Sequence, residues 1–334
     1  MDAVTFIEIK VRTPTKRGQH HSTVVTDLDV LGVHTAPDLS VVRTVAECKS
    51  GSRDLVGDLY KLAGVVSSQR VDKALLVRTH IGAHVREVAR SLSIWVADPE
   101  EIETLLKQWV PDVAKELAAE ENYIGKSIEF GTDVGKRHPA ETSFVLHDHW
   151  NVDDGRAIAG IVRAVGNIGN ATVLELPDRA VLAAGLLAVG VRLLSFAGQV
   201  MRLYAHDPGL GARLQLAGGM RQLKERDALA AIIRDALPGE QASRVTGEPE
   251  YMRELAELAF RLFRAAPIAS RCPSILERFT RWIVSDGTDV QLPMLTGLVQ
   301  GATPESLKFA QDIAVALAKW TKLPGEPFRH LLAL

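Results

Sequence analysis

The sequence has few cysteines and no excess of one charge. Its 334 residues include two cysteines, Cys48 and Cys272, which lie too far apart in sequence to share a metal motif. So few cysteines, with no recognisable signal peptide, predict a reducing, cytoplasmic location. The formal net charge of −2 argues against a uniformly basic nucleic-acid binder. Any contact with phosphates must therefore rest on a local basic patch.

Two further observations narrow the function classes. No G-x-x-x-x-G-K-[ST] loop occurs, which excludes an NTPase of the P-loop kind. Residues 181–200 form an apolar run long enough to cross a bilayer. Arg192 falls at the centre of this run, and a central arginine costs at least about 2.5 kcal/mol on membrane-insertion scales. We therefore interpret the run as a buried core helix, with membrane contact as the alternative.

Length and composition predict two domains. With 46% hydrophobic and 24% charged residues, the chain can bury a sizeable core. We expect an α/β domain over residues 1–110, a linker or irregular connection over residues 111–140, and a mostly α-helical domain of unknown role over residues 141–334. The connection is placed there because residues 120–140 contain glycines, lysines, an aspartate and a histidine, with little periodicity.

The stretch from residue 26 to residue 49 carries the most informative pattern. Two runs rich in β-branched residues, 26–33 and 41–49, flank a turn that contains Pro37 and Asp38. Such a pattern is typical of a β-hairpin with a loop of more than two residues. Cys48, inside the second run, is expected to be a buried strand residue and not a nucleophile.

Helices and strands alternate after this hairpin. The spacing of apolar residues predicts helices over residues 54–66 and 81–92, strands over residues 73–78 and 93–97, and a further helix from Asp98. Strands that alternate with helices at this spacing predict a parallel element joined to the antiparallel hairpin. The fold class expected for this part is therefore a mixed sheet flanked by helices.

Acidic side chains lie near the ends of the hairpin strands. Alternate side chains of a strand share a face, so Glu47 and Lys49 point together, and Asp29 on the partner strand can project beside Glu47. Two converging carboxylates repel each other unless a cation lies between them, and oxygen ligands of this kind suit Mg²⁺. The Lys49 ammonium could then stabilise a developing negative charge or orient an attacking water.

An aspartate followed on the next strand by Glu47, Cys48 and Lys49 resembles the metal site of the PD-(D/E)xK nuclease superfamily. The order of elements, a glycine in the helix after the motif and the late strand containing Ile94 and Val96 are similar to the Mrr-like restriction endonuclease group. This resemblance covers roughly residues 5–108, and it implies a restriction-endonuclease-like fold for the first domain.

The resemblance also implies an activity. A member of this group would be a metal-dependent nuclease that hydrolyses phosphodiester bonds in nucleic acid, with DNA as the expected substrate. Asp29, Glu47 and Lys49 would be catalytic. Asp29 and Glu47 would hold Mg²⁺, or Mn²⁺ in its place, together with the backbone carbonyl of Cys48. Asp27 shares a face with Asp29, but the family pattern of an aspartate directly before a Val-Leu-Gly run favours Asp29.

An alternative is a catalytically inactive nuclease-fold protein that acts as a nucleic-acid-binding or protein-interaction module. Many members of the group place a helix before the first strand, and a glutamate of that helix completes the metal site. Here a strand is predicted from Ile7, which leaves Glu8 as the nearest substitute. In this alternative the helical domain would bind a partner or form a homo-oligomer.

Other polar residues have both a structural and a functional interpretation. The run from His147 to Asp154 could bind a metal, but we favour a turn in which Asp153 or Asp154 caps the next helix. His80 and His84 are interpreted as helix surface. Basic residues near the start of the chain form either a solvated loop or a phosphate-contacting one: Lys10, Arg12, Lys16, Arg17, His20 and His21.

Overall fold

The structure is a computed structural model of the chain. It describes residues 3–12, 24–50, 54–69, 71–109, 113–170, 174–238, 245–285, 302–323, 326–328 and 331. The basic residues 16, 17, 20 and 21 lie outside this part, as do the side chains of Glu8, Lys10, Arg12 and Asp27.

The first part of the chain forms a five-stranded mixed sheet in the order β1-β2-β3-β4-β5. The strands are β1 (Val4–Arg12), β2 (Val24–Thr35), β3 (Val41–Lys49), β4 (Lys73–Arg78) and β5 (Ile94–Ala97). The first three strands pair antiparallel, whereas β4 and β5 continue the sheet in parallel. The predicted hairpin, the later strands and the mixed sheet are confirmed.

The tip of the β2–β3 hairpin packs against the helical region. Leu39 at this tip is fully buried although its φ of 62° lies in the left-handed region, which costs a non-glycine residue of order 1–3 kcal/mol. The neighbouring helix approaches through Gly198, where an added Cβ would lie 2.9 Å from the Leu39 carbonyl oxygen. Asp38 forms an ion pair with Arg202 at 3.2 Å. These contacts fix the hairpin relative to the helices.

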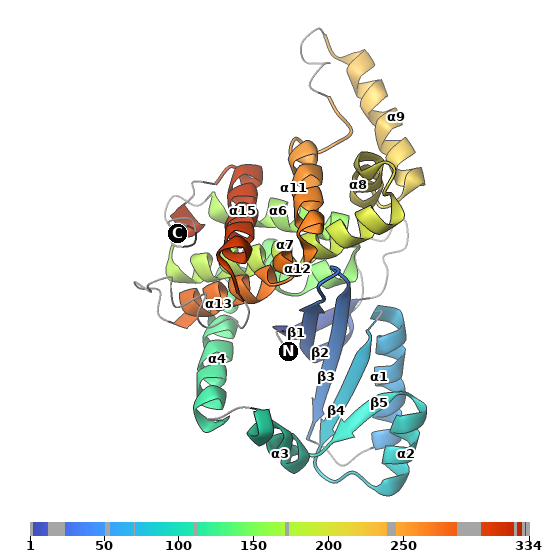
Figure 1. The fold of residues 1–334 in the computed structure, drawn as a ribbon, viewed down its shortest axis with the longest axis vertical. Helices are drawn as coiled ribbons and strands as arrows, with labels where there is room; N and C mark the ends of the chain where they lie inside the picture. Colours follow the sequence, from blue (N-terminus) through green and yellow to red (C-terminus); the bar gives the residue numbers. More distant parts are fainter. Residues whose placement is uncertain are drawn as a thin grey trace.

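Two helices accompany the parallel strands. Helix α1 (Leu55–Gln69) buries Leu59, Leu62 and Val65, and α2 (Ala83–Ser91) buries Val85 and Ala89. Figure 1 shows both helices beside β4 and β5, with α3 (Pro99–Trp109) following at the lower end of the sheet. Short crossover helices between parallel strands are the expected solution for such a sheet.

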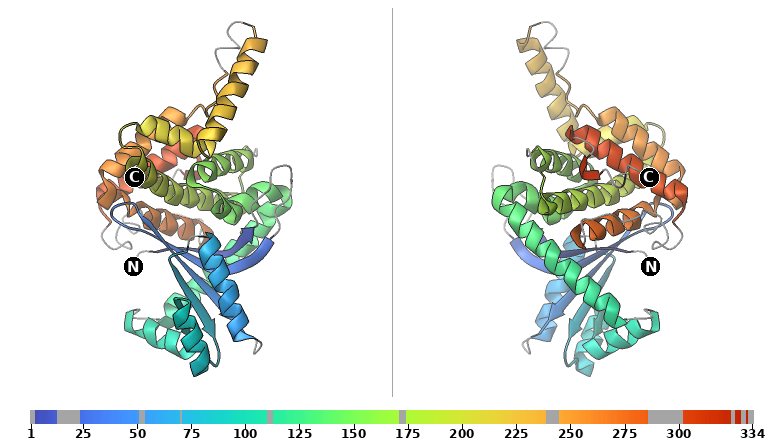
Figure 2. Two further views of the ribbon diagram at one scale, coloured as in Figure 1. Left: turned by 90° about the vertical axis from the view of Figure 1, so that its right-hand side faces the viewer. Right: turned by 90° about the vertical axis from the view of Figure 1, so that its left-hand side faces the viewer.

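The connection predicted over residues 111–140 is instead helical. Helix α4 (Val113–Arg137) runs for 25 residues from α3 toward the remaining helices (Figures 1 and 2). One of the glycines that suggested an irregular segment, Gly131, permits close helix packing, because a Cβ there would lie 2.9 Å from Leu146 Cδ1. Tertiary packing outweighs the weak helix propensity of glycine here.

The remainder of the described chain is mostly helical, as expected. Its elements are α5 (Pro139–Leu146), η1 (Asp148–Asn151), α6 (Asp154–Gly169), α7 (Leu176–Leu203), α8 (Pro208–Ala217), α9 (Met220–Ala236), α11 (Met252–Arg264), α12 (Ala266–Ala269), α13 (Cys272–Ser285), α15 (Pro304–Thr321) and η2 (Glu326–Phe328). The most apolar part of α7 passes for a membrane span by length and composition, but 94% of it is buried among the other elements.

Apolar packing joins the sheet to the helices. One continuous cluster of buried apolar side chains contains residues from β1, β2 and β3 and from α6, α7 and α13. Phe6 of β1 packs edge-on against Trp150 of η1, with ring centroids 4.7 Å apart. The buried core therefore extends across residues 111–140, and the division of the chain into two domains stays a prediction.

Candidate functional site

Polar side chains gather on the α1 side of the sheet, at the carboxyl ends of β3 and β4. Parallel pairing sets Glu47 opposite Leu76 and Lys49 opposite Arg78, so these four side chains share one face. Helix α1 covers this face, because Asp58 of α1 accepts a hydrogen bond from Arg78 Nη1 at 2.9 Å. The carboxyl ends of parallel strands are where open α/β sheets commonly bind ligands.

Glu47 and Lys49 form an ion pair on this face. Glu47 is only 7% exposed, and its Oε1 pairs with Lys49 Nζ. Its other oxygen, Oε2, is buried and has no hydrogen-bond partner in the described part of the chain. The hydrogen bond from Glu47, together with its charge, raises the pKa of Lys49 although partial burial opposes this. Lys49 is therefore a cation at neutral pH with a side chain 40% exposed.

Asp29 of β2 reaches the same end of β3. The register pairs Val30 with Ala46, and Asp29, the residue before Val30, accepts a hydrogen bond from the backbone N–H of Cys48 through its Oδ2 at 2.6 Å. The negative charge of Asp29 also contributes to the raised pKa of Lys49. The structure thus brings Asp29 of β2 to the carboxyl end of β3, where Glu47 and Lys49 lie, so the three residues named from the sequence are near one another.

Cys48 differs from the expectation. It was predicted to be buried, but its side chain alternates away from Glu47 and is exposed. Partial desolvation, and then the charges of Asp29 and Glu47, raise the pKa of the Cys48 thiol. A thiol that stays protonated is a weak nucleophile, so the contribution of this residue to the site is confined to its backbone groups.

Sequence reasoning missed Asp58 and Arg78. Arg78 is 2% exposed and is held by the carboxylate of Asp58, whose charge is also among the causes of the raised pKa of Lys49. The alternation of buried residues in β4, Ala74, Leu76 and Arg78, indicates that Arg78 points inward, and Asp58 directly precedes Leu59, which is buried in α1. This pattern does not place either residue next to Lys49, because the parallel register cannot be predicted from it.

The donor set partly fits a divalent cation. Carboxylate oxygens are the ligands that Mg²⁺ prefers, and the unpartnered Oε2 of Glu47 is available as such a ligand. Within the described residues, however, no three His, Cys, Asp or Glu side chains lie close enough together to hold a metal ion. A cation here would rely on Asp29, Glu47 and a backbone carbonyl, for which Cys48 is the predicted donor.

The second polar run has a structural role in the described residues. Asp153 caps α6 by accepting from the Arg156 N–H at 3.0 Å, as predicted. Asp154 instead points inward and accepts from the Arg192 Nη1 at 2.7 Å. His149 lies in the same cluster, where its Nδ1 accepts from Arg192 Nε at 3.3 Å.

Comparisons with protein-family models, with curated proteins and with solved structures found no match for this chain.

Proposed function

We propose that the chain is a metal-dependent nuclease that hydrolyses phosphodiester bonds in nucleic acid, with DNA as its substrate. The observation that carries this proposal is the meeting of Asp29, Glu47 and Lys49 at the end of β3. The order of the sheet, an antiparallel β1-β2-β3 continued in parallel by β4 and β5, is compatible with a restriction-endonuclease-like fold.

Each residue has a role that its surroundings support. Asp29 and Glu47, with the carbonyl of Cys48, would hold Mg²⁺, which polarises a phosphodiester and lowers the pKa of a bound water. Lys49, kept protonated by Glu47, offsets the negative charge that develops on the phosphate. Asp58, held by Arg78, is a positioning residue that adds a carboxylate near the ammonium of Lys49.

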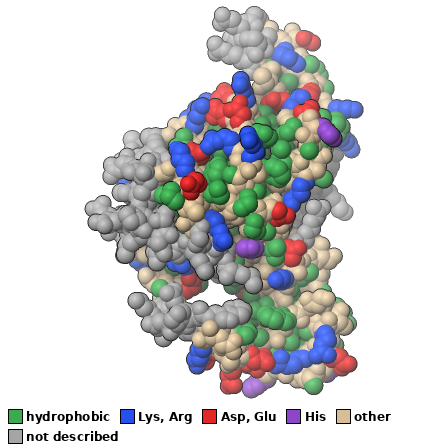
Figure 3. Space-filling view, in the orientation of Figure 1, with side chains coloured by type: hydrophobic (Ala, Val, Ile, Leu, Met, Phe, Trp, Pro, Cys, Tyr) green, Lys and Arg blue, Asp and Glu red, His purple; other side chains and the backbone are tan. Residues whose placement is uncertain are grey.

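Binding of nucleic acid would depend on local charge. The net charge is −2, and Figure 3 shows basic and acidic side chains interspersed over the helical region on the face that it draws. Few phosphate contacts give a shallow dependence of affinity on salt, about one power of salt concentration per phosphate neutralised. We therefore expect weak binding that declines gradually as the salt concentration is raised.

The test is nicking of plasmid DNA by the purified chain with Mg²⁺ or Mn²⁺, and with EDTA as the metal-free control. Asp29→Asn, Glu47→Gln and Lys49→Met should each reduce nicking by about 10²-fold or more, because each removes a group that acts on the reacting phosphate. Thermal unfolding of each variant checks that the fold is retained.

Asp72 offers a matched control for Asp29. Its carboxylate also accepts a backbone N–H of β3, from Arg43 at 2.7 Å, but at the opposite end of that strand. Asp72→Asn should leave metal-dependent nicking within about twofold of wild type if the end of β3 is the site. Equal nicking by the wild type and by all three site variants would refute the assignment.

A second candidate is a nuclease-fold module that binds without cleaving. Two observations favour it: Glu47 is already paired with Lys49, and the described residues contain no cluster of three ligand side chains. Retention of labelled DNA in a gel-shift assay, with no nicking in either metal, would support this reading. In that case Asp29→Asn and Asp72→Asn should bind DNA equally well.

A further inference from the structure

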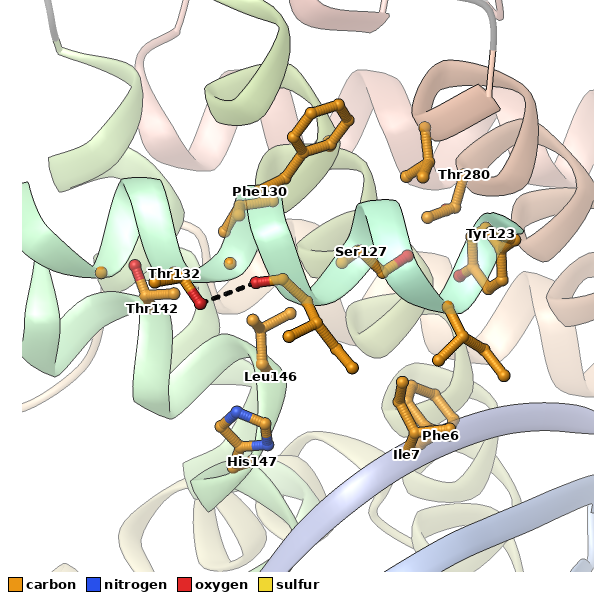
Figure 4. A pocket seen from close by; sticks show the side chains of 18 of the residues that line it. Phe6, Ile7, Tyr123, Ser127, Phe130, Thr132, Thr142, Leu146, His147 and Thr280 are labelled. Atoms are coloured by element: carbon orange, nitrogen blue, oxygen red, sulfur yellow. Dashed lines mark hydrogen bonds between the residues drawn. The ribbon is translucent and has the colours of Figure 1, made fainter. Parts of the chain in front are cut away.

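A cavity of about 330 Å³ lies where β1 meets the helices α4, α5, α7 and α13. Figure 4 shows Phe6 and Ile7 of β1 on one side of it, with Phe130 of α4 and Leu146 of α5 among the other walls. Its volume is at the lower end of the range of small-molecule sites, about 300–1,000 Å³. It is separate from the carboxylates at the end of β3, none of which lines it.

The cavity offers no unpaired carboxylate, lysine or arginine to a ligand. Glu120 and His147 are the acidic and basic side chains among the described residues that line it, and both oxygens of Glu120 accept from Arg281. Arg281 in turn lies over the ring of Tyr123, 4.7 Å from its centroid. An ionised ligand would lose its hydration in this cavity without a lysine, an arginine or a free carboxylate to pair with it. The lining therefore favours a neutral ligand.

Two hydroxyls in the wall, those of Ser127 and Thr142, have no hydrogen-bond partner among the described residues. Thr132 donates to the Ile128 carbonyl at 2.8 Å, as drawn in Figure 4, and Thr280 donates to the carbonyl of Leu276 at 2.8 Å. Thr142 is 4% exposed, and its Oγ1 finds no partner in the described part of the chain. A buried hydroxyl in this state carries an uncompensated loss of hydration, which a hydrogen-bonding ligand would remove.

Tyr123 adds a second polar group at the other end. Its hydroxyl and that of Ser127 point toward one another in Figure 4. Burial raises the pKa of Tyr123, so its hydroxyl keeps its proton. The hydroxyls of Thr142 and Tyr123, set among apolar wall residues such as Phe6, match a ligand that is mainly aromatic or aliphatic and carries a hydrogen-bond acceptor.

We propose that this cavity binds a neutral, mainly apolar small molecule with a carbonyl or similar acceptor, which takes a hydrogen bond from Thr142. This proposal goes beyond the nuclease proposal and does not depend on it, because no residue of the cavity belongs to the candidate nuclease site. Its test needs no cleavage assay, so either proposal can fail alone.

The first experiment titrates the full chain with PRODAN, a neutral naphthalene ketone whose fluorescence shifts to the blue in apolar surroundings. We expect saturable binding to one site, and at least tenfold weaker binding of the anionic probe anilinonaphthalene sulfonate. Absence of saturable PRODAN binding, or a preference for the anion, would overturn the proposal.

A pair of glycine variants locates the site. Gly135 lines the cavity, and a Cβ there would meet only Thr142 Cγ2, at 3.9 Å, whereas Gly125 on the same helix faces open space. Gly135→Leu should fill the cavity and weaken PRODAN binding at least tenfold, while Gly125→Leu leaves it within twofold. Equal effects of the two variants would mean that the probe binds elsewhere.

A pair of threonine variants tests the hydrogen bond with less change of volume. Thr142→Val removes the unpartnered hydroxyl, so we expect PRODAN affinity to fall about fivefold while the melting temperature of the free protein stays or rises. Thr132→Val makes the same change at the rim, where the hydroxyl already bonds its own helix, and should leave the affinity unchanged. Unchanged affinity in Thr142→Val would exclude the proposed hydrogen bond.

Discussion

Asp154 of α6 and Glu47 of β3 are both buried carboxylates that pair with a basic side chain, but their surroundings differ. Asp154 accepts from Arg192 through one oxygen and from Ser195 and Gln199 through the other. Glu47 pairs through one oxygen only, and its basic partner, Lys49, is 40% exposed. Both oxygens of Asp154 therefore have hydrogen-bond partners within the protein, whereas Oε2 of Glu47 is available to a ligand.

This difference separates a structural cluster from a candidate site. A fully satisfied buried network makes the packing of helices specific, since every polar group has one arrangement of partners. A buried oxygen without a partner carries a cost that persists only where other interactions or a ligand offset it. Residue type alone does not distinguish the two clusters, because each contains a carboxylate and a cation. Their hydrogen bonding distinguishes them.

The largest effect on stability is expected at Arg192. Arg192→Leu leaves the carboxylate of Asp154 buried without its cation, which should lower the free energy of unfolding by about 3–5 kcal/mol. Denaturant unfolding followed by circular dichroism measures this change. Arg156→Leu is the control, because Arg156 pairs with Asp153 at the surface, where an ion pair contributes about 0–1 kcal/mol. Similar losses of stability in both variants would contradict a structural role specific to the buried ion pair.

The next largest effect is a pH dependence from His149. Burial, and then the charges of Arg192, His147 and Arg43, lower the pKa of His149 well below 6.5. Its Nε2 is buried with no partner among the described residues. Below pH 6.5 the unfolded chain therefore takes up a proton that the folded chain does not. Stability should then fall by about 1.4 kcal/mol for each pH unit below 6.5, until the lowered pKa is reached.

A variant isolates this contribution. His149→Gln keeps an acceptor for Arg192 but does not titrate, so the acid slope should be shallower than in the wild type. His84→Gln replaces an exposed histidine of α2 and should leave the slope unchanged. Parallel slopes for the wild type and His149→Gln would show that His149 already takes up a proton in the folded state.

Substitution of Glu47 should change stability little and activity strongly. Glu47→Gln removes an ion pair to a partly exposed lysine, which is worth about 0–1 kcal/mol, and it also removes a buried charge. Its free energy of unfolding should therefore stay within about 1 kcal/mol of wild type, although nicking is lost. A large destabilisation would mean that Glu47, like Asp154, has a structural role.

The sequence predicts the strands of the sheet better than it predicts the contacts between helices. β-Branched runs and apolar spacing indicate β2, β3, β4 and α1, because those patterns follow directly from burial of one face. Helix α4 was missed because its glycines lower helix propensity, although one of them, Gly131, permits a close contact with Leu146. Such contacts depend on the tertiary structure.

The candidate site was predicted in part for a similar reason. Asp29, Glu47 and Lys49 lie on adjacent strands of one hairpin, so local register brings them together. Asp58 and Arg78 come from a helix and a parallel strand, whose register depends on a crossover connection. The partnership of Asp154 and Arg192 spans two helices and was also missed, although the cost of a central arginine pointed to a partner.

The smallest expected effect concerns Lys49 at alkaline pH. Because Glu47 raises the pKa of Lys49 above 10.5, its ion pair contributes fully below that pH and is lost as the pH rises through the raised value. The difference in unfolding free energy between wild type and Lys49→Met should therefore be constant at neutral pH and shrink above about pH 10.5. Such convergence would show that the pair on the sheet opens when Lys49 loses its proton, whereas a difference that stays constant well above pH 10.5 would contradict the proposed role of the pair.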